Sequence, residues 1–140
     1  MSNLSGQVAV VTGANQGIGK GIAKALAQAG CRLAICARNA EKLTATANEL
    51  RAAGAEVLAV PTDVSQEADV VAFFAAIDQQ FGQVDVLVNN AGAFDGGPLD
   101  ELSFEAWNNV IGACLHGTFL CSREAFKRMK PRRSGRILNI

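Results

Sequence analysis

Apolar residues fall into two alternating patterns along this chain. Short runs rich in Val, Ala, Ile and Leu predict buried strands at residues 7–12, 32–37, 56–60, 85–88 and 136–140. Between these runs, apolar residues recur every three or four positions, which predicts helices at residues 17–29, 39–53, 65–81 and 103–129. Helical crossovers between strands are typical of parallel sheets, so the pattern predicts an α/β fold with a doubly wound parallel sheet of strand order 3-2-1-4-5.

Polar and conformationally special residues mark the ends of the predicted helices. Asn39, Ser65 and Ser103 each precede a helical pattern and predict N-caps, because their side-chain oxygens accept hydrogen bonds from first-turn amides. Gly82 predicts the end of the third helix, and Pro131 prevents the fourth from continuing. A stretch rich in Gly and Asp, about residues 90–102, predicts a loop before the fourth helix.

Composition narrows the class of protein. With 140 residues, the chain predicts one domain, residues 1–140. Its 13 basic and 13 acidic residues balance, which argues against nucleic-acid or membrane partners, and the basic cluster at residues 127–136 is interpreted as a solvated helix end and loop. No apolar run approaches the length of a membrane span, and the N-terminus lacks the pattern of a signal peptide, so we expect a cytoplasmic protein.

The four cysteines do not form a metal-binding pattern. None belongs to a Cys-x-x-Cys pair, and His116 is the only histidine, so the sequence predicts no metal site. Buried free thiols in a reducing cytosol are the favoured interpretation. Cys114 and Cys121 lie seven positions apart on one predicted helix, and we expect both to face the core.

A glycine-rich turn joins the first strand to the first helix. Gly13 allows a tight turn, Gly17 allows backbone to approach a phosphate, and Gly19 allows the helix to pack closely on the sheet. The positive end of the following helix also favours an anion. An ordinary glycine turn is the alternative, but the position between strand and helix favours a nucleotide pyrophosphate. The spacing excludes a Walker A loop, because Gly13 and Gly19 are separated by five residues and Gly21 follows Lys20.

Polar residues follow each of the next three predicted strands. Arg38 ends the second strand where a carboxylate would favour NAD, so NADP is favoured over NAD, although an exposed arginine is common at a strand end. Asp63 either accepts a hydrogen bond from an adenine amino group or stabilises a turn. The segment 89–92, Asn-Asn-Ala-Gly, either lines a cofactor cleft, ties strands together or forms an ordinary loop.

Together, these motifs resemble the short-chain dehydrogenase/reductase family in residue type, order and spacing. The motifs are Thr12-Gly13-x-x-x-Gly17-x-Gly19, Asp63-Val64 and Asn89-Asn90-Ala91-Gly92, and the resemblance covers the whole chain. It implies a Rossmann-like dinucleotide-binding domain in which Gly13 and the residues Asn15, Gln16, Gly17, Ile18 and Gly19 wrap the pyrophosphate. By the same resemblance, Arg38 faces the adenosine 2′ position, Asp63 and Val64 meet the adenine, and Asn90, Ala91 and Gly92 flank the nicotinamide-side ribose.

The sequence departs from the family at its catalytic residues. Cys114 occupies the position of the family's helix asparagine, and the chain contains no tyrosine, the family's general acid. The family's catalytic Ser, Tyr and Lys would follow Ile140, so we expect the chain to be truncated before them, with no catalytic residue of its own and without the family's C-terminal strands and helices.

The resemblance implies an NAD(P)-dependent oxidoreductase that transfers hydride between nicotinamide and a small-molecule carbonyl or alcohol, and forms a homo-oligomer at full length. On this hypothesis the 140-residue chain alone is inactive. The alternative is a non-catalytic nucleotide-binding or interaction module, if 140 residues form the complete protein.

Overall fold

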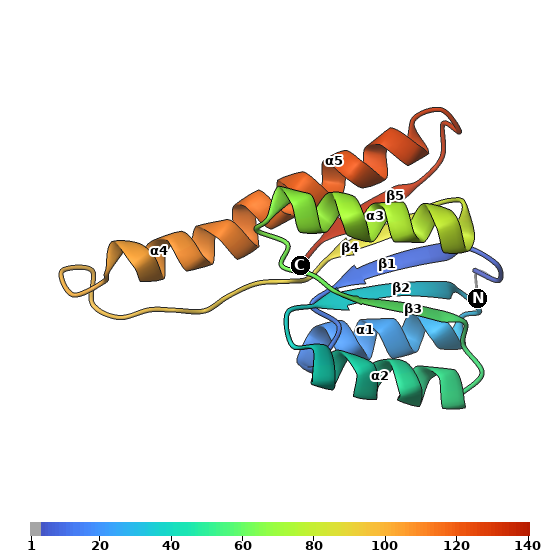
Figure 1. Ribbon diagram of the computed structural model, residues 1–140, viewed down its shortest axis with the longest axis horizontal. Coiled ribbons are helices and arrows are strands. Elements are labelled where there is room, and N and C mark those ends of the chain that lie inside the picture. The colour runs from blue at the N-terminus through green and yellow to red at the C-terminus, as the bar shows by residue number, and fades with distance from the viewer. Residues whose placement is uncertain (1–3) are drawn as a thin grey trace.

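The computed structural model describes residues 4–140 and contains one parallel sheet at its centre (Figure 1). The strand order is β3-β2-β1-β4-β5, and all four neighbouring pairs are parallel. The predicted fold class and strand order are therefore confirmed. The strands are β1 (Val8–Thr12), β2 (Arg32–Ala37), β3 (Val57–Pro61), β4 (Val86–Asn89) and β5 (Arg136–Asn139).

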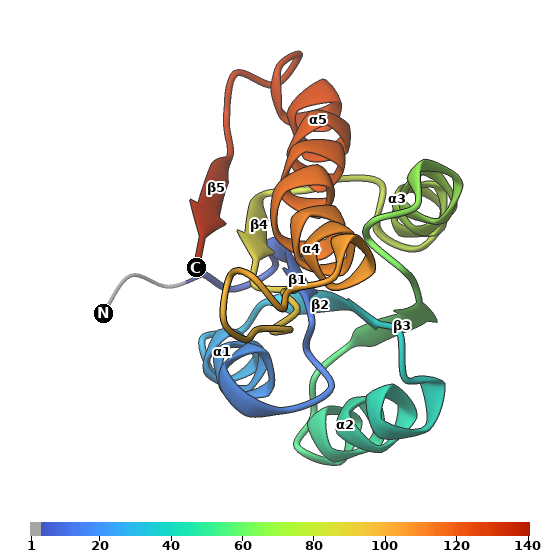
Figure 2. The ribbon, with the colours of Figure 1, turned by 90° about the vertical axis from the view of Figure 1, so that its left-hand side faces the viewer.

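Helices cover both faces of the sheet, as Figure 2 shows. On one face lie α1 (Gly17–Gln28) and α2 (Ala40–Ala52), and on the other lie α3 (Glu67–Phe81) and α5 (Gly117–Met129). Side chains alternate between the faces along each strand, so Val8 and Val10 belong to one core cluster and Ala9 and Val11 to the other. Burial on both faces explains why β1 is a continuous apolar run.

The ends of α2 and α3 follow local side-chain chemistry. The predicted cap Asn39 accepts a hydrogen bond from the backbone N–H of Lys42 at 2.8 Å, and Gly82 ends α3 in the left-handed conformation, with φ of 71°. The prediction that Ser65 caps α3 is wrong, because the helix begins at Glu67 after Gln66. The Ser65 hydroxyl instead donates to Asp63 Oδ1 at 2.7 Å, which holds the turn before the helix.

The long helix predicted at residues 103–129 is interrupted. Ser103 accepts from the backbone N–H of Ala106 and begins α4 (Phe104–Ile111), as predicted. A π-helical segment, η1 (Gly112–His116), then separates α4 from α5. In Figure 1, α4 and the preceding loop project beyond the sheet, while α5 packs along it. This placement leaves Cys114 exposed, so the expectation that it faces the core is wrong, whereas Cys31, Cys36 and Cys121 are buried.

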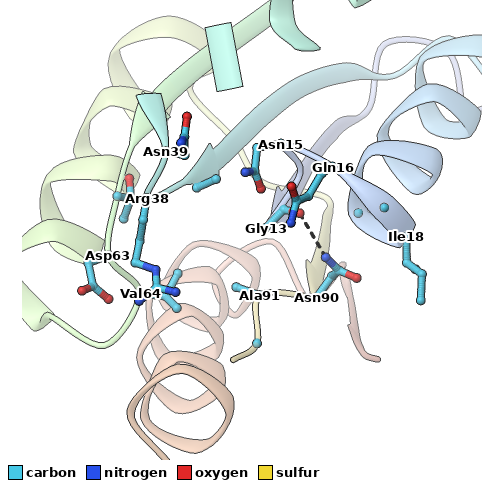
Figure 3. A pocket seen from close by; sticks show the side chains of 15 residues that line it. Gly13, Asn15, Gln16, Ile18, Arg38, Asn39, Asp63, Val64, Asn90 and Ala91 are labelled. Atoms are coloured by element: carbon cyan, nitrogen blue, oxygen red, sulfur yellow. Dashed lines mark hydrogen bonds between the residues drawn. The ribbon is translucent and has the colours of Figure 1, made fainter. Parts of the chain in front are cut away.

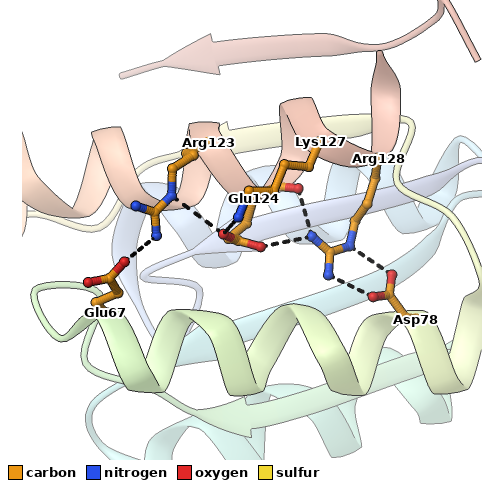
Figure 4. A network of polar contacts seen from close by, with 6 residues as sticks. All are labelled: Glu67, Asp78, Arg123, Glu124, Lys127 and Arg128. Carbon is orange, nitrogen blue, oxygen red and sulfur yellow. Dashed lines mark hydrogen bonds and ion pairs between the residues drawn. The ribbon is translucent and has the colours of Figure 1, made fainter. Parts of the chain in front are cut away.

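Charged side chains join α3 to α5 (Figure 4). Glu124 is only 4% exposed and accepts from Lys127 Nζ at 2.7 Å and from Arg128 Nη1 at 3.1 Å. Arg128 also binds Asp78 on α3 through two hydrogen bonds of 2.6 and 2.7 Å. The interpretation of residues 127–136 as merely solvated is therefore wrong for Arg128, which binds the buried Glu124 on its own helix and the partly exposed Asp78 on α3.

Candidate nucleotide-binding site

The carboxyl ends of the strands converge on one cavity of about 380 Å³. In a parallel sheet these ends lie at the same edge, so residues that follow different strands become neighbours. All twelve residues proposed from the sequence line this cavity, and Figure 3 shows ten of the lining side chains by label. The twelve are Gly13, Asn15, Gln16, Gly17, Ile18, Gly19, Arg38, Asp63, Val64, Asn90, Ala91 and Gly92.

Gly19 allows the glycine turn to close against the loop after β4. A Cβ atom at Gly19 would collide with the carbonyl group of Gly13 and with the side-chain amide of Asn90. Gly13 has a φ of 67°, and a Cβ there would lie 2.9 Å from Ala91 Cα. Glycine is therefore required at both positions, by space at Gly19 and by space and backbone conformation at Gly13.

The N-terminus of α1 faces this turn without a competing acidic group. No side chain caps the helix, and its first turn contains no acidic residue. The unpaired amides and the helix dipole therefore favour an anion at this end of the cavity. The backbone N–H groups of Gly13 and Ala14 are already used, since both donate to the Cys36 carbonyl, at 2.8 and 3.2 Å.

Thr12 connects the glycine turn to the loop after β4. Its hydroxyl oxygen accepts from the backbone N–H groups of Asn90 at 3.1 Å and Ala91 at 2.9 Å. In return, Asn90 Nδ2 donates to the carbonyl of Thr12 at 3.1 Å and to that of Gly13 at 3.3 Å, and Figure 3 shows the bond to Gly13. Thr12 is 2% exposed and its partners Asn90 and Ala91 are partly buried, so these bonds are shielded from water on the Thr12 side and fix the floor of the cavity.

Asn89 and Asn90 have different roles. Asn89 points away from the cavity residues, and its Nδ2 donates to Ser122 Oγ and Asn139 Oδ1, both at 2.9 Å. It therefore ties β4 to α5 and β5, whereas Asn90 both ties β1 to β4 and lines the cavity. Both residues thus tie strands together, and only Asn90 also lines the cavity.

Arg38 and Asp63 lie at the other end of the cavity. The Arg38 side chain extends along the cavity toward the Asp63–Val64 segment (Figure 3), and no described carboxylate forms an ion pair with it. Asp63 Oδ1 accepts from both the backbone N–H and the hydroxyl of Ser65, so one oxygen of this carboxylate is used by the turn. Both interpretations of Asp63, as turn residue and as cavity residue, fit its geometry.

Three further residues, Ala37, Asn39 and Thr62, line the cavity and were not proposed from the sequence. Each adjoins a proposed residue in the chain, so its position at or just after the end of a strand was the available indication. Asn39 was interpreted only as a helix cap, a role it does perform. Among residues 4–140, no cluster of three or more His, Cys, Asp or Glu side chains is arranged to hold a metal ion.

Cys114 lies where the long helix approaches the loop after β4. Its Sγ is 3.8 Å from the carbonyl oxygen of Ala93, and 3.5 Å from where a Cβ at Gly92 would stand. The Cys114 carbonyl accepts from the Thr118 hydroxyl at 2.7 Å, within the segment interrupted by η1. The thiol therefore borders the end of the cavity formed by Asn90, Ala91 and Gly92.

Comparison with known proteins decides the family. The sequence model of the short chain dehydrogenase family matches residues 7–140. The chain belongs to this family. A 3-oxoacyl-[acyl-carrier-protein] reductase of Synechocystis is 39% identical over 141 residues, which are 100% of this chain and 57% of that protein. The chain spans about half the length of the curated relatives it matches.

Solved structures of the family agree with the fold. A metagenomic short-chain oxidoreductase in complex with NADP has a TM-score of 0.92 and 41% identity, covering 99% of this chain and 63% of that one. A variant of actinorhodin polyketide ketoreductase with NADPH has a TM-score of 0.93 and 42% identity, covering 99% and 53%. Within the described residues, no helix is both long and apolar enough to cross a membrane.

Proposed function

We propose that residues 1–140 form the NADP-binding domain of a short-chain dehydrogenase that transfers hydride between nicotinamide and a small-molecule carbonyl or alcohol. The observation that carries this proposal is the arrangement of the cavity. A glycine turn and an open helix N-terminus form one end, and the exposed Arg38 forms the other. The similar solved structures that hold NADP and NADPH support the same conclusion.

The residues of the cavity fit such a dinucleotide. Gly13 and Gly19 let the turn close tightly against the loop after β4. Gly17, with a φ of 55° and nothing within 4 Å of where its Cβ would stand, leaves room for the backbone to approach the proposed pyrophosphate. At the end of β2, where a carboxylate would bind a ribose 2′-hydroxyl, the chain has Ala37 and Arg38. A guanidinium favours a 2′-phosphate, so NADP is the proposed cofactor and NAD the less favoured one.

Each segment of the cavity has a proposed role in binding. The residues Asn15, Gln16, Gly17, Ile18 and Gly19 would hold the pyrophosphate, with Gly13 closing the turn beneath it. Asp63 and Val64 would contact the adenine, and Asn90, Ala91 and Gly92 would position the nicotinamide-side ribose. When bound, the nicotinamide supplies or accepts the hydride, and this chain orients it and excludes water around it.

The experiment that tests the proposal is a fluorescence titration of residues 1–140 with NADPH and NADH. We expect tighter binding of NADPH, and Arg38→Asp should weaken NADPH binding by about 1–3 kcal/mol because a charge-assisted contact is lost. Arg133→Asp makes the same charge change at the opposite end of the sheet, in the loop after α5, and serves as the matched control. Equal losses of NADPH and NADH affinity in Arg38→Asp would contradict the role of Arg38.

The same 140 residues should bind without catalysing turnover. They contain no tyrosine to act as general acid, and general acid–base catalysis contributes about 10²–10⁴-fold. Cys114 occupies the position of the family's asparagine, and a thiol is a weak hydrogen-bonding substitute for an amide. NADPH absorbance with a panel of ketones and aldehydes tests this expectation. Steady turnover that survives repurification would contradict it, and an intact-mass measurement of the source protein separates a longer enzyme from a 140-residue module.

Self-association is also proposed, through the long helix. Apolar side chains remain exposed at helical spacing along α4, η1 and α5: Phe104 at 77%, Trp107 at 49%, Leu115 at 60%, Phe119 at 60% and Phe126 at 56%. Such a row is typical of a covered helix face. Sedimentation analysis of the source protein should give an oligomer that Phe119→Glu dissociates, and an unchanged oligomer would contradict this interface.

A further inference from the structure

Lys42 lies on α2 beside the glycine turn, although it does not line the cavity. Its Nζ donates to Gln16 Oε1 at 3.2 Å. One helical turn later, the Thr46 hydroxyl donates to the Asn15 carbonyl at 3.3 Å. Residues four positions apart share a helix face, so one face of α2 contacts two successive residues of the turn, Asn15 and Gln16, that line the cavity.

This contact places the Lys42 ammonium at the rim of the cavity, between the glycine turn that carries Gln16 and the start of α2, which directly follows Arg38 and Asn39. Gln16, Arg38 and Asn39 all line the cavity, and Asn39 caps the first turn of the helix that carries Lys42. Both Lys42 and Arg38 are exposed. The rim therefore carries two cationic side chains on long, flexible stems, one from the end of β2 and one from the start of α2.

Lys42 forms no ion pair with the described carboxylates near this rim. Its one described polar partner is the neutral Gln16 amide, whereas Lys20 and Lys24 on α1 both pair with Glu49 of α2, at 2.6 and 3.1 Å. Glu41 precedes Lys42 in the chain, and Asp63 lines the cavity with one oxygen bonded to Ser65. Neither of these carboxylates forms a described ion pair with Lys42, so its charge is available to an anion.

We propose that Lys42 is a second cofactor-specificity residue, which binds the adenosine 2′-phosphate together with Arg38. The inference rests on the proposed NADP-binding function. The Lys42 ammonium exchanges Gln16 Oε1 for a phosphate oxygen, while the planar Arg38 guanidinium binds the same group from the β2 side. Lysine binds phosphate as a point charge and arginine through a fixed fork, so the two contributions are complementary. Gln16 acts as the neutral resting partner of Lys42 in the absence of the phosphate.

The test is a set of equilibrium titrations of residues 1–140 with NADP⁺, NAD⁺ and 2′,5′-ADP. Lys42→Gln should weaken NADP⁺ and 2′,5′-ADP binding by about five- to twentyfold, the size of one charge-assisted contact at a solvated site, and leave NAD⁺ binding unchanged. Lys42→Arg, which keeps the charge, should retain most of the affinity for NADP⁺. Lys24→Gln removes a charge that already pairs with Glu49 and is the matched control.

The outcomes separate this inference from the proposed function. NADP⁺ binding by Lys42→Gln within twofold of the unchanged protein would overturn the role of Lys42 and leave the proposed function standing. Equal losses of NADP⁺ and NAD⁺ affinity would also overturn it, because the contact with Gln16 would then only support the turn. If the protein without substitutions binds neither NADP⁺ nor NAD⁺, both the proposed function and the role of Lys42 are overturned. Circular dichroism of each variant checks that α2 is intact.

Discussion

At the scale of single residues, Gly19 and Gly21 both lie in the first turns of α1 but differ sharply in the space available for a side chain. A Cβ at Gly19 would collide with Gly13 and Asn90, whereas a Cβ at Gly21 has nothing within 4 Å. Gly19→Ala should therefore destabilise the protein by about 1–3 kcal/mol, the usual cost of overpacking, and weaken NADPH binding at least tenfold.

Gly21→Ala is the matched control, because it adds the same methyl group two positions away. It should stabilise the protein by about 0.5–1 kcal/mol, since alanine favours a helix interior over glycine. Urea denaturation and NADPH titration of both variants measure these effects. A Gly19→Ala variant as stable as Gly21→Ala would show that the close approach of turn and loop is not needed.

Thr12 is a second residue at which we expect the chemistry of the side chain to affect stability more than its size does. Thr12→Val keeps the shape of the side chain but leaves the partly buried N–H groups of Asn90 and Ala91 without their acceptor. We expect a loss of about 2–4 kcal/mol in the free energy of unfolding, since each unsatisfied group costs about 1–3 kcal/mol. Thr12→Ser retains the hydroxyl, and urea denaturation should give it most of the original stability. Equal losses in the two variants would assign the effect to packing.

At the scale of elements, Glu124 joins α3 and α5 through Lys127, Arg128 and Asp78. Glu124→Gln removes a buried charge and leaves the cations of Lys127 and Arg128 incompletely paired, so the unfolding free energy should fall by about 2–4 kcal/mol. Glu67→Gln breaks the exposed pair with Arg123 on the same two helices and should cost less than about 1 kcal/mol. Denaturation midpoints of the two variants measure the difference, and a similar cost for both would contradict the hub role of Glu124.

The elements themselves followed from the pattern of apolar residues because each depends on local burial. The strand predicted at residues 32–37 is β2, and the one predicted at residues 56–60 is β3, displaced by one residue. The π-helical segment η1 could not be predicted, because five residues are too few to alter a helical period over a helix of this length. Its consequence, the exposure of Cys114, was missed for the same reason.

The candidate cavity was predictable because its residues follow successive strands, and parallel strands bring their carboxyl ends together. The hydrogen bonds and ion pairs between side chains could not be predicted from the sequence. Glu124 lies among Arg123, Lys127 and Arg128, which resembles a solvated charged face, and only the packing of α3 against α5 buries it. Lys42 similarly resembles an ordinary surface lysine until α2 is placed against the glycine turn.

At the scale of the whole molecule, paired carboxylates set the response to acid. Burial opposes the charge of Glu124, but hydrogen bonds from Lys127 and Arg128 outweigh it and hold the pKa of that carboxyl below its usual value. Burial also opposes the charge of Asp85, and bonds from Arg132, the Val8 backbone and Gln83 likewise lower its pKa. Asp85, which accepts from the Val8 backbone N–H and from Arg132, thereby ties the starts of β1 and β4 to the loop before β5.

A carboxyl whose pKa is lower in the folded protein than in the unfolded chain binds fewer protons in the folded state. It therefore contributes its full stabilisation at a pH above its pKa in the unfolded chain. That stabilisation is lost as the pH falls through its pKa in the folded protein. We therefore expect the unfolding free energy to be constant from about pH 7 to 5 and to decline below about pH 4. Glu124→Gln should make this decline shallower. Denaturant titrations across pH 3–7 measure both slopes, and parallel curves would exclude Glu124 from the acid response.

The bonds among Thr12, Asn90 and Ala91 join atoms of the chain itself and use no ligand atom. Ordering a flexible residue costs about 1–2 kcal/mol, and here that entropy is lost during folding, so little ordering of the floor remains for binding. The exposed rim is different, because charges such as Arg38 and Lys42 act through water and are screened beyond a Debye length of about 8–10 Å. With a rigid floor beneath a charged rim, the preference for a dinucleotide that carries a 2′-phosphate depends on salt. Raising the ionic strength should reduce the difference between the affinities for NADP and NAD, while the cavity keeps its shape.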